Sequence, residues 1–231
     1  HIASFAKVRC ASRKRTASTA APTAAAPKKP LFTGKQLSFR STVIALGAST
    51  GGTEATLAVL KQLPADIPGM VITQHMPEGF TAMYAQRLNK LCQMEVREAK
   101  NGDQIRPGLV LIAPGSQQME VVRSANGGYA VRCFSGQKVS GHMPSVDVLF
   151  RSVAKNVAGN KIGIIMTGMG KDGAEGLLEM RKKGAFTIGQ DKASCVVYGM
   201  PMVAYNIGAV SIQAGCEQIP SVLLNHLKKS S

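Results

Sequence analysis

The stretch TVIALGASTGGTEATLAVLKQ, residues 42–62, decides the fold class. Residues 42–46 are a short β-branched and apolar run, whereas residues 53–62 carry apolar side chains at helical spacing. The glycine-rich segment 47–52 joins the two. A continuous apolar strand that leads directly into a helix is typical of a parallel sheet with both faces covered. The stretch therefore predicts a strand–turn–helix unit of an α/β protein.

The same alternation of apolar strands and helices continues toward the end of the chain. Further strands are expected at 70–74, 161–167 and 185–189, and helices at 82–91, 146–156, 174–183 and 219–227. Residues 109–113, 119–123 and 129–133 predict a β-meander, with Asn126-Gly127-Gly128 as a tight hairpin turn. We expect a doubly wound α/β fold over residues 42–231: a mainly parallel sheet with helices on both faces and a small antiparallel β-hairpin excursion.

Residues 1–41 differ in composition and predict a flexible basic linker rich in Ala, Pro and Lys. Residues 1–40 hold nine of the 28 Lys and Arg residues and no acid, so most of the net charge of +15 belongs to this segment. Residues 17–30 have no periodic apolar face whose burial could offset the entropy of ordering. Few aromatic residues interleave with these charges, so we expect no nucleic-acid partner. Because the chain begins at His1 with linker-like sequence, we expect a further domain before it.

Composition and residue spacing exclude several classes of protein. An apolar content of 45% excludes a chain that is disordered throughout. No apolar run reaches the roughly 18 residues of a membrane span. The five cysteines are scattered without a C-x-x-C pair, which favours free thiols in a reducing cytoplasm. The four histidines show no H-E-x-x-H or other paired spacing, so no metal site is expected.

Two residues at the carboxyl ends of the first two strands are candidates for nucleophilic catalysis, because sites in parallel sheets collect there. GASTGG, residues 47–52, matches G-x-S-x-G, a turn that presents a serine hydroxyl, here that of Ser49. The alternative is an ordinary turn in which Ser49 or Thr50 caps the helix. His75 ends the strand 70–74 and is a candidate base, or else a hydrogen-bonded structural histidine. His142 is a rival base.

The third strand end, GMGKDG at residues 168–173, allows two interpretations. It is a literal G-x-G-x-x-G with Asp191 about 20 residues further on, which is the dinucleotide-binding fingerprint. Against this, Asp172 would place a carboxylate beside the pyrophosphate. The other interpretation is that Asp172 accepts a hydrogen bond from a histidine and fixes its tautomer. A plain first-turn acid, favoured by the helix dipole, is also possible. Ser145 most simply caps the helix 146–156, and His226 is expected on a solvated helix surface.

Several motifs together resemble one family. GASTGG, QHMPEGFT, IAPG, PSVDVLF, TGMGKDGAEGL and SCVVYGMP occur in the order and approximate spacing of the chemotaxis protein-glutamate methylesterases of the CheB type. The resemblance covers about residues 42–228. It implies a cytoplasmic serine hydrolase, without cofactor or metal, that removes methyl esters from glutamates on chemoreceptor helices and releases methanol. It also implies deamidation of certain receptor glutamines.

The resemblance places the catalytic serine, histidine and aspartate of the family on Ser49, His75 and Asp172. Ser49 would attack the ester carbonyl, His75 would move the proton, and Asp172 would orient His75. Backbone amides of Thr50, Met169 and Gly170 would support the oxyanion or the substrate. The implied partners are the cytoplasmic helices of methyl-accepting chemoreceptors and an N-terminal receiver domain, absent here, that would precede the linker. No direct membrane insertion is expected. Met143 stands where many relatives have arginine.

Overall fold

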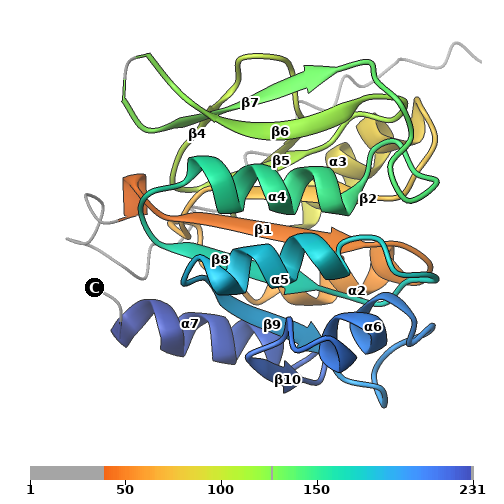
Figure 1. The fold of residues 1–231 in the computed structure, drawn as a ribbon. Helices are drawn as coiled ribbons and strands as arrows, with labels where there is room; N and C mark the ends of the chain where they lie inside the picture. Colours follow the sequence, from red (N-terminus) through yellow and green to blue (C-terminus); the bar gives the residue numbers. More distant parts are fainter. Residues whose placement is uncertain (1–38, 126, 230–231) are drawn as a thin grey trace, which may run out of the picture.

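The computed structural model describes residues 39–125 and 127–229, drawn as a ribbon in Figure 1. A seven-stranded sheet runs through the centre in the order β10-β9-β8-β1-β2-β5-β3, and its neighbouring strands are parallel. Its strands are β1 (Val43–Ala48), β2 (Met70–Gln74), β3 (Glu95–Glu98), β5 (Leu109–Ile112), β8 (Lys161–Ile165), β9 (Phe186–Gln190) and β10 (Ile212–Ala214). The predicted mainly parallel sheet is confirmed.

Helices cover both faces of this sheet. They are α2 (Gly52–Lys61), α3 (Phe80–Leu91), α4 (Val146–Asn156), α5 (Ala174–Lys182), α6 (Met200–Asn206) and α7 (Ile219–Lys229). From β1, Ile44 and Leu46 enter a core with α2, α3 and α7, whereas Val43 and Ala45 enter a second core with α4, α5 and α6. Because successive strand side chains point to opposite faces, one continuous apolar run supplies both cores. Figure 1 shows α4, α5 and α6 across the near face of the sheet.

A second, antiparallel sheet packs on the outer side of α4. It consists of β4 (Gln104–Ile105), β7 (Tyr129–Phe134) and β6 (Gln118–Arg123), in that order. Met119 and Val121 of β6 share a core with Leu149 and Val153 of α4. The expected antiparallel excursion is therefore present as a three-stranded sheet. The connection between β6 and β7 runs from residue 124 to 128, which is longer than a tight two-residue turn; Asn126 lies outside the described residues.

One strand lies in a different sheet from the one that its sequence predicts. Residues 109–113 were expected in the meander, but Leu109–Ile112 lies in the parallel sheet between β2 and β3. All four of its residues are buried, as in a strand covered on both faces. The true meander strand β6 instead alternates partly exposed and buried residues near its end. The continuous apolar run LVLI was thus the signal for the parallel sheet.

The short elements β3, β4, β10 and α6 were not predicted. The strand β3 reads EVRE and lies at the edge of the sheet, where polar side chains reach solvent and the apolar signal is weak. The linker expected at 1–41 falls almost entirely outside the described residues. Phe39, the first described residue, is buried in the core of the α2 face. Within the described ranges, no helix combines the length and apolar character needed to cross a bilayer.

Candidate active site

Three neighbouring strands, β8, β1 and β2, end at the same edge of the sheet, and a predicted site residue follows each one. Ser49 follows β1, His75 follows β2, and Asp172 lies in the loop after β8. The register pairs Ala48 with Gln74, so Ser49 and His75 are the next residues on adjacent strands. The ladder extends one bond further, from the His75 amide to the Ala48 carbonyl at 3.0 Å. The fold therefore gathers the three residues at one strand edge.

The Ser49 loop, residues 47–52, turns sharply from β1 into α2. Gly51 has φ 79° and is the N-cap residue of α2, which has no side-chain capping bond. Glycine adopts this left-handed conformation without steric cost. The alternative in which Ser49 or Thr50 caps the helix is therefore wrong. Ser49 is half-buried, and its amide donates to the Thr167 carbonyl at 3.0 Å. The hydroxyl is thus presented at the end of the strand rather than used by α2.

The Asp172 loop, residues 168–173, packs directly against the Ser49 loop. A Cβ added at Gly168 would lie 2.7 Å from the Cβ of Ser49, which is closer than real Cβ contacts. Only glycine at 168 lets the two backbones approach in this way. The Gly168 amide donates to the Val197 carbonyl at 3.0 Å, and its carbonyl accepts from the Met200 amide at 2.8 Å. The segment before α6 therefore holds the Asp172 loop in place.

His75 and Asp172 form the closest side-chain pair of the site. Nε2 of His75 lies 2.7 Å from Oδ2 of Asp172, and the two side chains are 8% and 1% exposed. Because an ionised carboxylate only accepts, this bond assigns the ring proton to Nε2. Nδ1 is then the acceptor nitrogen, and it is buried with no hydrogen-bond partner among the described residues. Such an orphaned acceptor is unfavourable unless a substrate or catalytic group uses it.

The Asp172 carboxylate accepts three further hydrogen bonds, all from the start of α4. Ser145 Oγ donates to Oδ1 at 2.7 Å, the Val146 amide to Oδ2 at 2.7 Å, and the Asp147 amide to Oδ1 at 3.0 Å. Burial alone would raise the pKa of Asp172, but the bonds from His75, Ser145 and the two amides hold that pKa below its usual value. The side chain therefore stays ionised at neutral pH and fixes the tautomer of His75.

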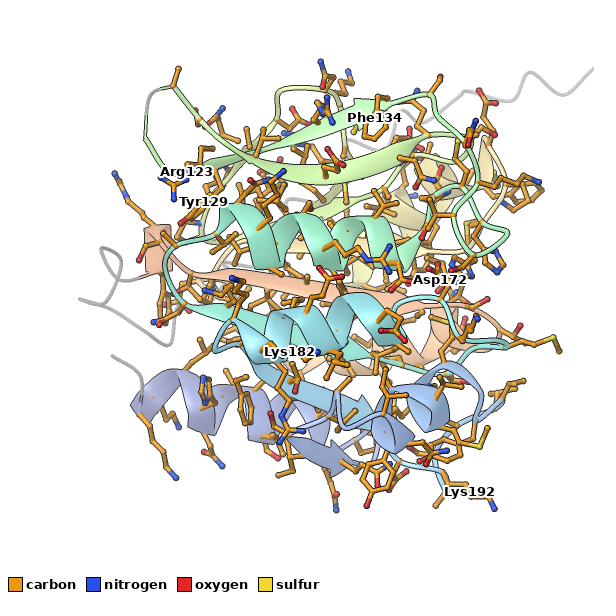
Figure 2. The ribbon with its side chains drawn as sticks, viewed as in Figure 1. Arg123, Tyr129, Phe134, Asp172, Lys182 and Lys192 are labelled. Atoms are coloured by element: carbon orange, nitrogen blue, oxygen red, sulfur yellow. The ribbon has the colours of Figure 1, made fainter. Side chains whose placement is uncertain are left out.

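The same junction shows that α4 and α5 cap each other. Asp172 caps α4 from the loop before α5, and Oδ1 of Asp147 in α4 accepts from the Gly176 amide of α5 at 2.7 Å. Figure 2 shows Asp172 between the N-terminal ends of the two helices. Ser145 does not cap α4 with its side chain, because its hydroxyl donates to Asp172 instead. Nor is Asp172 a first-turn acid of α5, since it precedes Gly173, the N-cap residue of that helix.

Three backbone amides were expected to support the oxyanion: those of Thr50, Met169 and Gly170. No hydrogen bond from within the described part of the chain engages any of them. Thr50 is exposed beside Ser49, and the Met169 side chain is 67% exposed on the Asp172 loop. Both loops therefore carry backbone amides that no described acceptor engages.

Gln74 is a site residue that the sequence did not single out. Its buried Nε2 donates to the Ser49 carbonyl at 2.9 Å and to the His75 carbonyl at 3.3 Å. One amide group therefore ties the backbones of the predicted nucleophile and base together. The available signal was a glutamine at the last position of a fully buried strand that begins with three apolar residues.

The two other histidines that the structure describes, His142 and His226, take other places. The ring of His142 stacks on that of His75, with centroids 3.7 Å apart and planes 12° from parallel. His226 stacks on Phe186 at 4.0 Å and is half-buried, not fully solvated as expected. Among the described residues, no group of three or more His, Cys, Asp or Glu could hold a metal ion.

The dinucleotide interpretation of residues 168–173 is not supported. The acid within the loop, Asp172, is already bound to His75 and α4. Asp191, the expected ribose partner, accepts from the Ser194 amide at 2.9 Å and from its hydroxyl at 2.7 Å, which organises a local turn. The glycines here allow the Ser49 loop and the Asp172 loop to pack closely, rather than making room for a pyrophosphate.

Comparisons with known proteins agree on one family. A family model described as CheB methylesterase matches residues 44–223. A Syntrophomonas wolfei protein named protein-glutamate methylesterase/protein-glutamine glutaminase 2 is 60% identical over 185 residues, covering 80% of this chain and 54% of the relative. A Salmonella choleraesuis protein named protein-glutamate methylesterase/protein-glutamine glutaminase is 49% identical over 220 residues, covering 94% of this chain and 61% of the relative.

The solved structure of the Thermotoga maritima CheB methylesterase catalytic domain has the same fold. The two superpose with a TM-score of 0.77 at 33% identity, over 80% of this chain and 97% of that one. The chain spans 54% to 61% of the length of the curated relatives just described.

Proposed function

Because the chain belongs to the CheB methylesterase family, we propose that residues 42–231 are a catalytic domain that hydrolyses methyl esters of glutamate side chains on chemoreceptors. The observation that carries this proposal is the buried His75–Asp172 pair, with its unpartnered Nδ1, beside Ser49 at the end of β1. A base held in one tautomer next to a serine is the arrangement that nucleophilic acyl transfer needs.

The reaction then runs in two halves. The Ser49 oxygen attacks the ester carbonyl while Nδ1 of His75 takes the hydroxyl proton, and Asp172 stabilises the resulting imidazolium. The tetrahedral oxyanion lies against free amides of Thr50, Met169 and Gly170. The intermediate expels methoxide, which takes the proton from His75 and leaves as methanol. Water, deprotonated by His75, hydrolyses the acyl-enzyme and returns Ser49 with a free glutamate carboxylate.

The geometry of Ser49 and His75 is compatible with this route. Nδ1 of His75 has no hydrogen-bond partner among the described residues, and catalytic bonds of this kind often tighten only when substrate binds. The same acyl-enzyme forms from a glutamine amide, with ammonia leaving in place of methanol. We therefore include deamidation of receptor glutamines, an activity that also stands in the names of the relatives.

The wider assignment follows the family. The substrate partners are cytoplasmic helices of methyl-accepting chemoreceptors, and the reaction belongs to the cytoplasm. Residues 1–41 form a linker that follows a receiver domain in the full-length protein. The chain length relative to its relatives is compatible with such a domain.

The test is methanol release from a methylated chemoreceptor, with the Ser49→Ala variant beside the wild-type chain. Ser221→Ala is a matched control, because Ser221 lies on the exposed surface of α7 and its hydroxyl bonds to the Gln218 carbonyl of the preceding turn. We expect release by the wild type and by Ser221→Ala, and none measurable by folded Ser49→Ala. Near-normal turnover by folded Ser49→Ala would remove the covalent mechanism.

A further inference from the structure

His142 lies flat on the predicted base but has no part in the mechanism above. We propose that His142 is a positioning residue, whose neutral ring holds the plane of the His75 imidazole so that Nδ1 faces the Ser49 hydroxyl. The inference rests on the proposed function, because it concerns the same site. Its geometric basis is the ring stack, with centroids 3.7 Å apart and planes 12° from parallel.

The hydrogen bond to Asp172 does not by itself fix the His75 ring. It restrains one ring atom, Nε2, at 2.7 Å from the carboxylate. Rotation of a histidine ring about the Cβ–Cγ bond has a broad energy profile, so the ring can still tilt. A parallel ring against one face blocks that tilt. Asp172 therefore sets the tautomer of His75, and His142 sets the ring plane.

The loop that carries His142 is fastened independently of the stack. The amide and carbonyl of His142 pair with Val139 at 2.9 and 3.0 Å. Gln118, which is 2% exposed on β6, donates from Nε2 to the carbonyls of Gln137 and His142 at 3.0 and 3.3 Å. Its Oε1 accepts from the Ser145 amide at 2.8 Å. One buried glutamine thus places both His142 against His75 and Ser145 against Asp172.

The charge state of His142 decides whether the stack helps the reaction. His75 becomes an imidazolium when it takes the serine proton, and a neutral aromatic face stabilises a cation whereas a second cation repels it. The charged or titratable groups that face His142 are His75, Asp172 and Lys138. Burial, with His75 and Lys138, lowers the pKa of His142 against the opposing effect of Asp172. His142 is therefore neutral at neutral pH.

The test compares His142→Phe, which keeps a flat ring, with His142→Leu and His142→Ala, which do not. We expect kcat for methanol release to fall about 10- to 100-fold in His142→Leu and His142→Ala, with KM changed much less, and to stay near wild type in His142→Phe. Wild-type kcat in folded His142→Leu, or equal losses in the phenylalanine and leucine variants, overturns the inference.

A second readout does not depend on turnover. The proton shared between His75 Nε2 and Asp172 gives a low-field NMR resonance that broadens when the ring is mobile. We expect this resonance to be sharp in the wild type and in His142→Phe and broadened in His142→Leu. A sharp resonance in all three proteins overturns the inference, whether or not the chain releases methanol. Failure to release methanol, taken alone, contradicts only the proposed function. If His142→Ala does not fold, the phenylalanine and leucine pair carries the test.

Discussion

The Ser49 loop and the Asp172 loop are built alike but hold the side chains proposed for catalysis differently. Each follows a central parallel strand, leads into a helix and has a glycine with positive φ as the N-cap residue of that helix. Ser49 is half-buried at the end of its strand and gives no side chain to α2, whereas Asp172 is 1% exposed and accepts four hydrogen bonds. A nucleophile has to remain free to attack, and an orienting carboxylate has to be held.

The largest effect is expected from removing the charge of Asp172, the side chain that is held in place. Asp172→Asn can no longer hold the His75 tautomer or stabilise its imidazolium, so we expect kcat for methanol release to fall about 10⁴-fold. Asp191→Asn is the control, because Asp191 organises only the turn at Ser194. A loss smaller than about tenfold in folded Asp172→Asn would show that the aspartate does not orient the base.

The contact between the two loops can be broken at Gly168. The added Cβ of Gly168→Ala would crowd Ser49 Cβ at 2.7 Å and the Met200 sulfur, so the two loops must separate. Because small displacements of a nucleophile are costly, we expect kcat to fall about 100-fold with little change in KM. Gly215→Ala is the control, since its added Cβ comes no closer than 3.4 Å to any neighbouring atom. Equal activity of the two variants would mean that the serine position does not depend on this approach.

The reciprocal capping of α4 and α5 can be tested by measuring the free energy of unfolding of a variant that lacks one cap. In Asp147→Ala the Gly176 amide loses its acceptor, so we expect the free energy of unfolding to fall by about 1–2 kcal/mol. Urea unfolding followed by circular dichroism measures this loss. An unchanged midpoint and slope in Asp147→Ala would contradict a capping role.

The two capping carboxylates should also respond to pH with opposite sign. The pKa of Asp172 is lowered in the folded state, so its contribution to stability is complete above the unfolded pKa of about 3.9 and is lost as pH falls through the folded value. Burial raises the pKa of Asp147, so the pH-dependent part of its contribution to stability is complete below about pH 3.9 and is lost as pH rises through the folded value. Asp147→Asn should therefore steepen the loss of stability in acid, and Asp172→Asn should flatten it. Urea unfolding at several pH values between about 2 and 6 measures both, and parallel profiles would contradict the assignment.

The sequence predicted the parts of the site that depend on local pattern. Apolar runs ending in Ser49 and His75 indicated strands, and strand ends in a parallel sheet converge, so these two residues could be placed side by side. The sequence predicts the wrong sheet for residues 109–112, because a short apolar run does not indicate which sheet the strand joins. The partners of Asp172 in α4 and the stack of His142 on His75 could not be predicted, because they join segments far apart in the chain through loop geometry.

The most direct test of the account is where an organophosphonate directed at activated serines reacts. In a fluorophosphonate, the oxygen of an activated serine attacks phosphorus and displaces fluoride while the base takes the hydroxyl proton, and intact-mass and peptide mass spectrometry locate the adduct. We predict one adduct, on Ser49, in the wild-type chain, and a rate reduced about 100-fold or more in folded His75→Ala. An adduct on another serine, or equal labelling of Ser49 without His75, would contradict a serine activated by the His75–Asp172 pair.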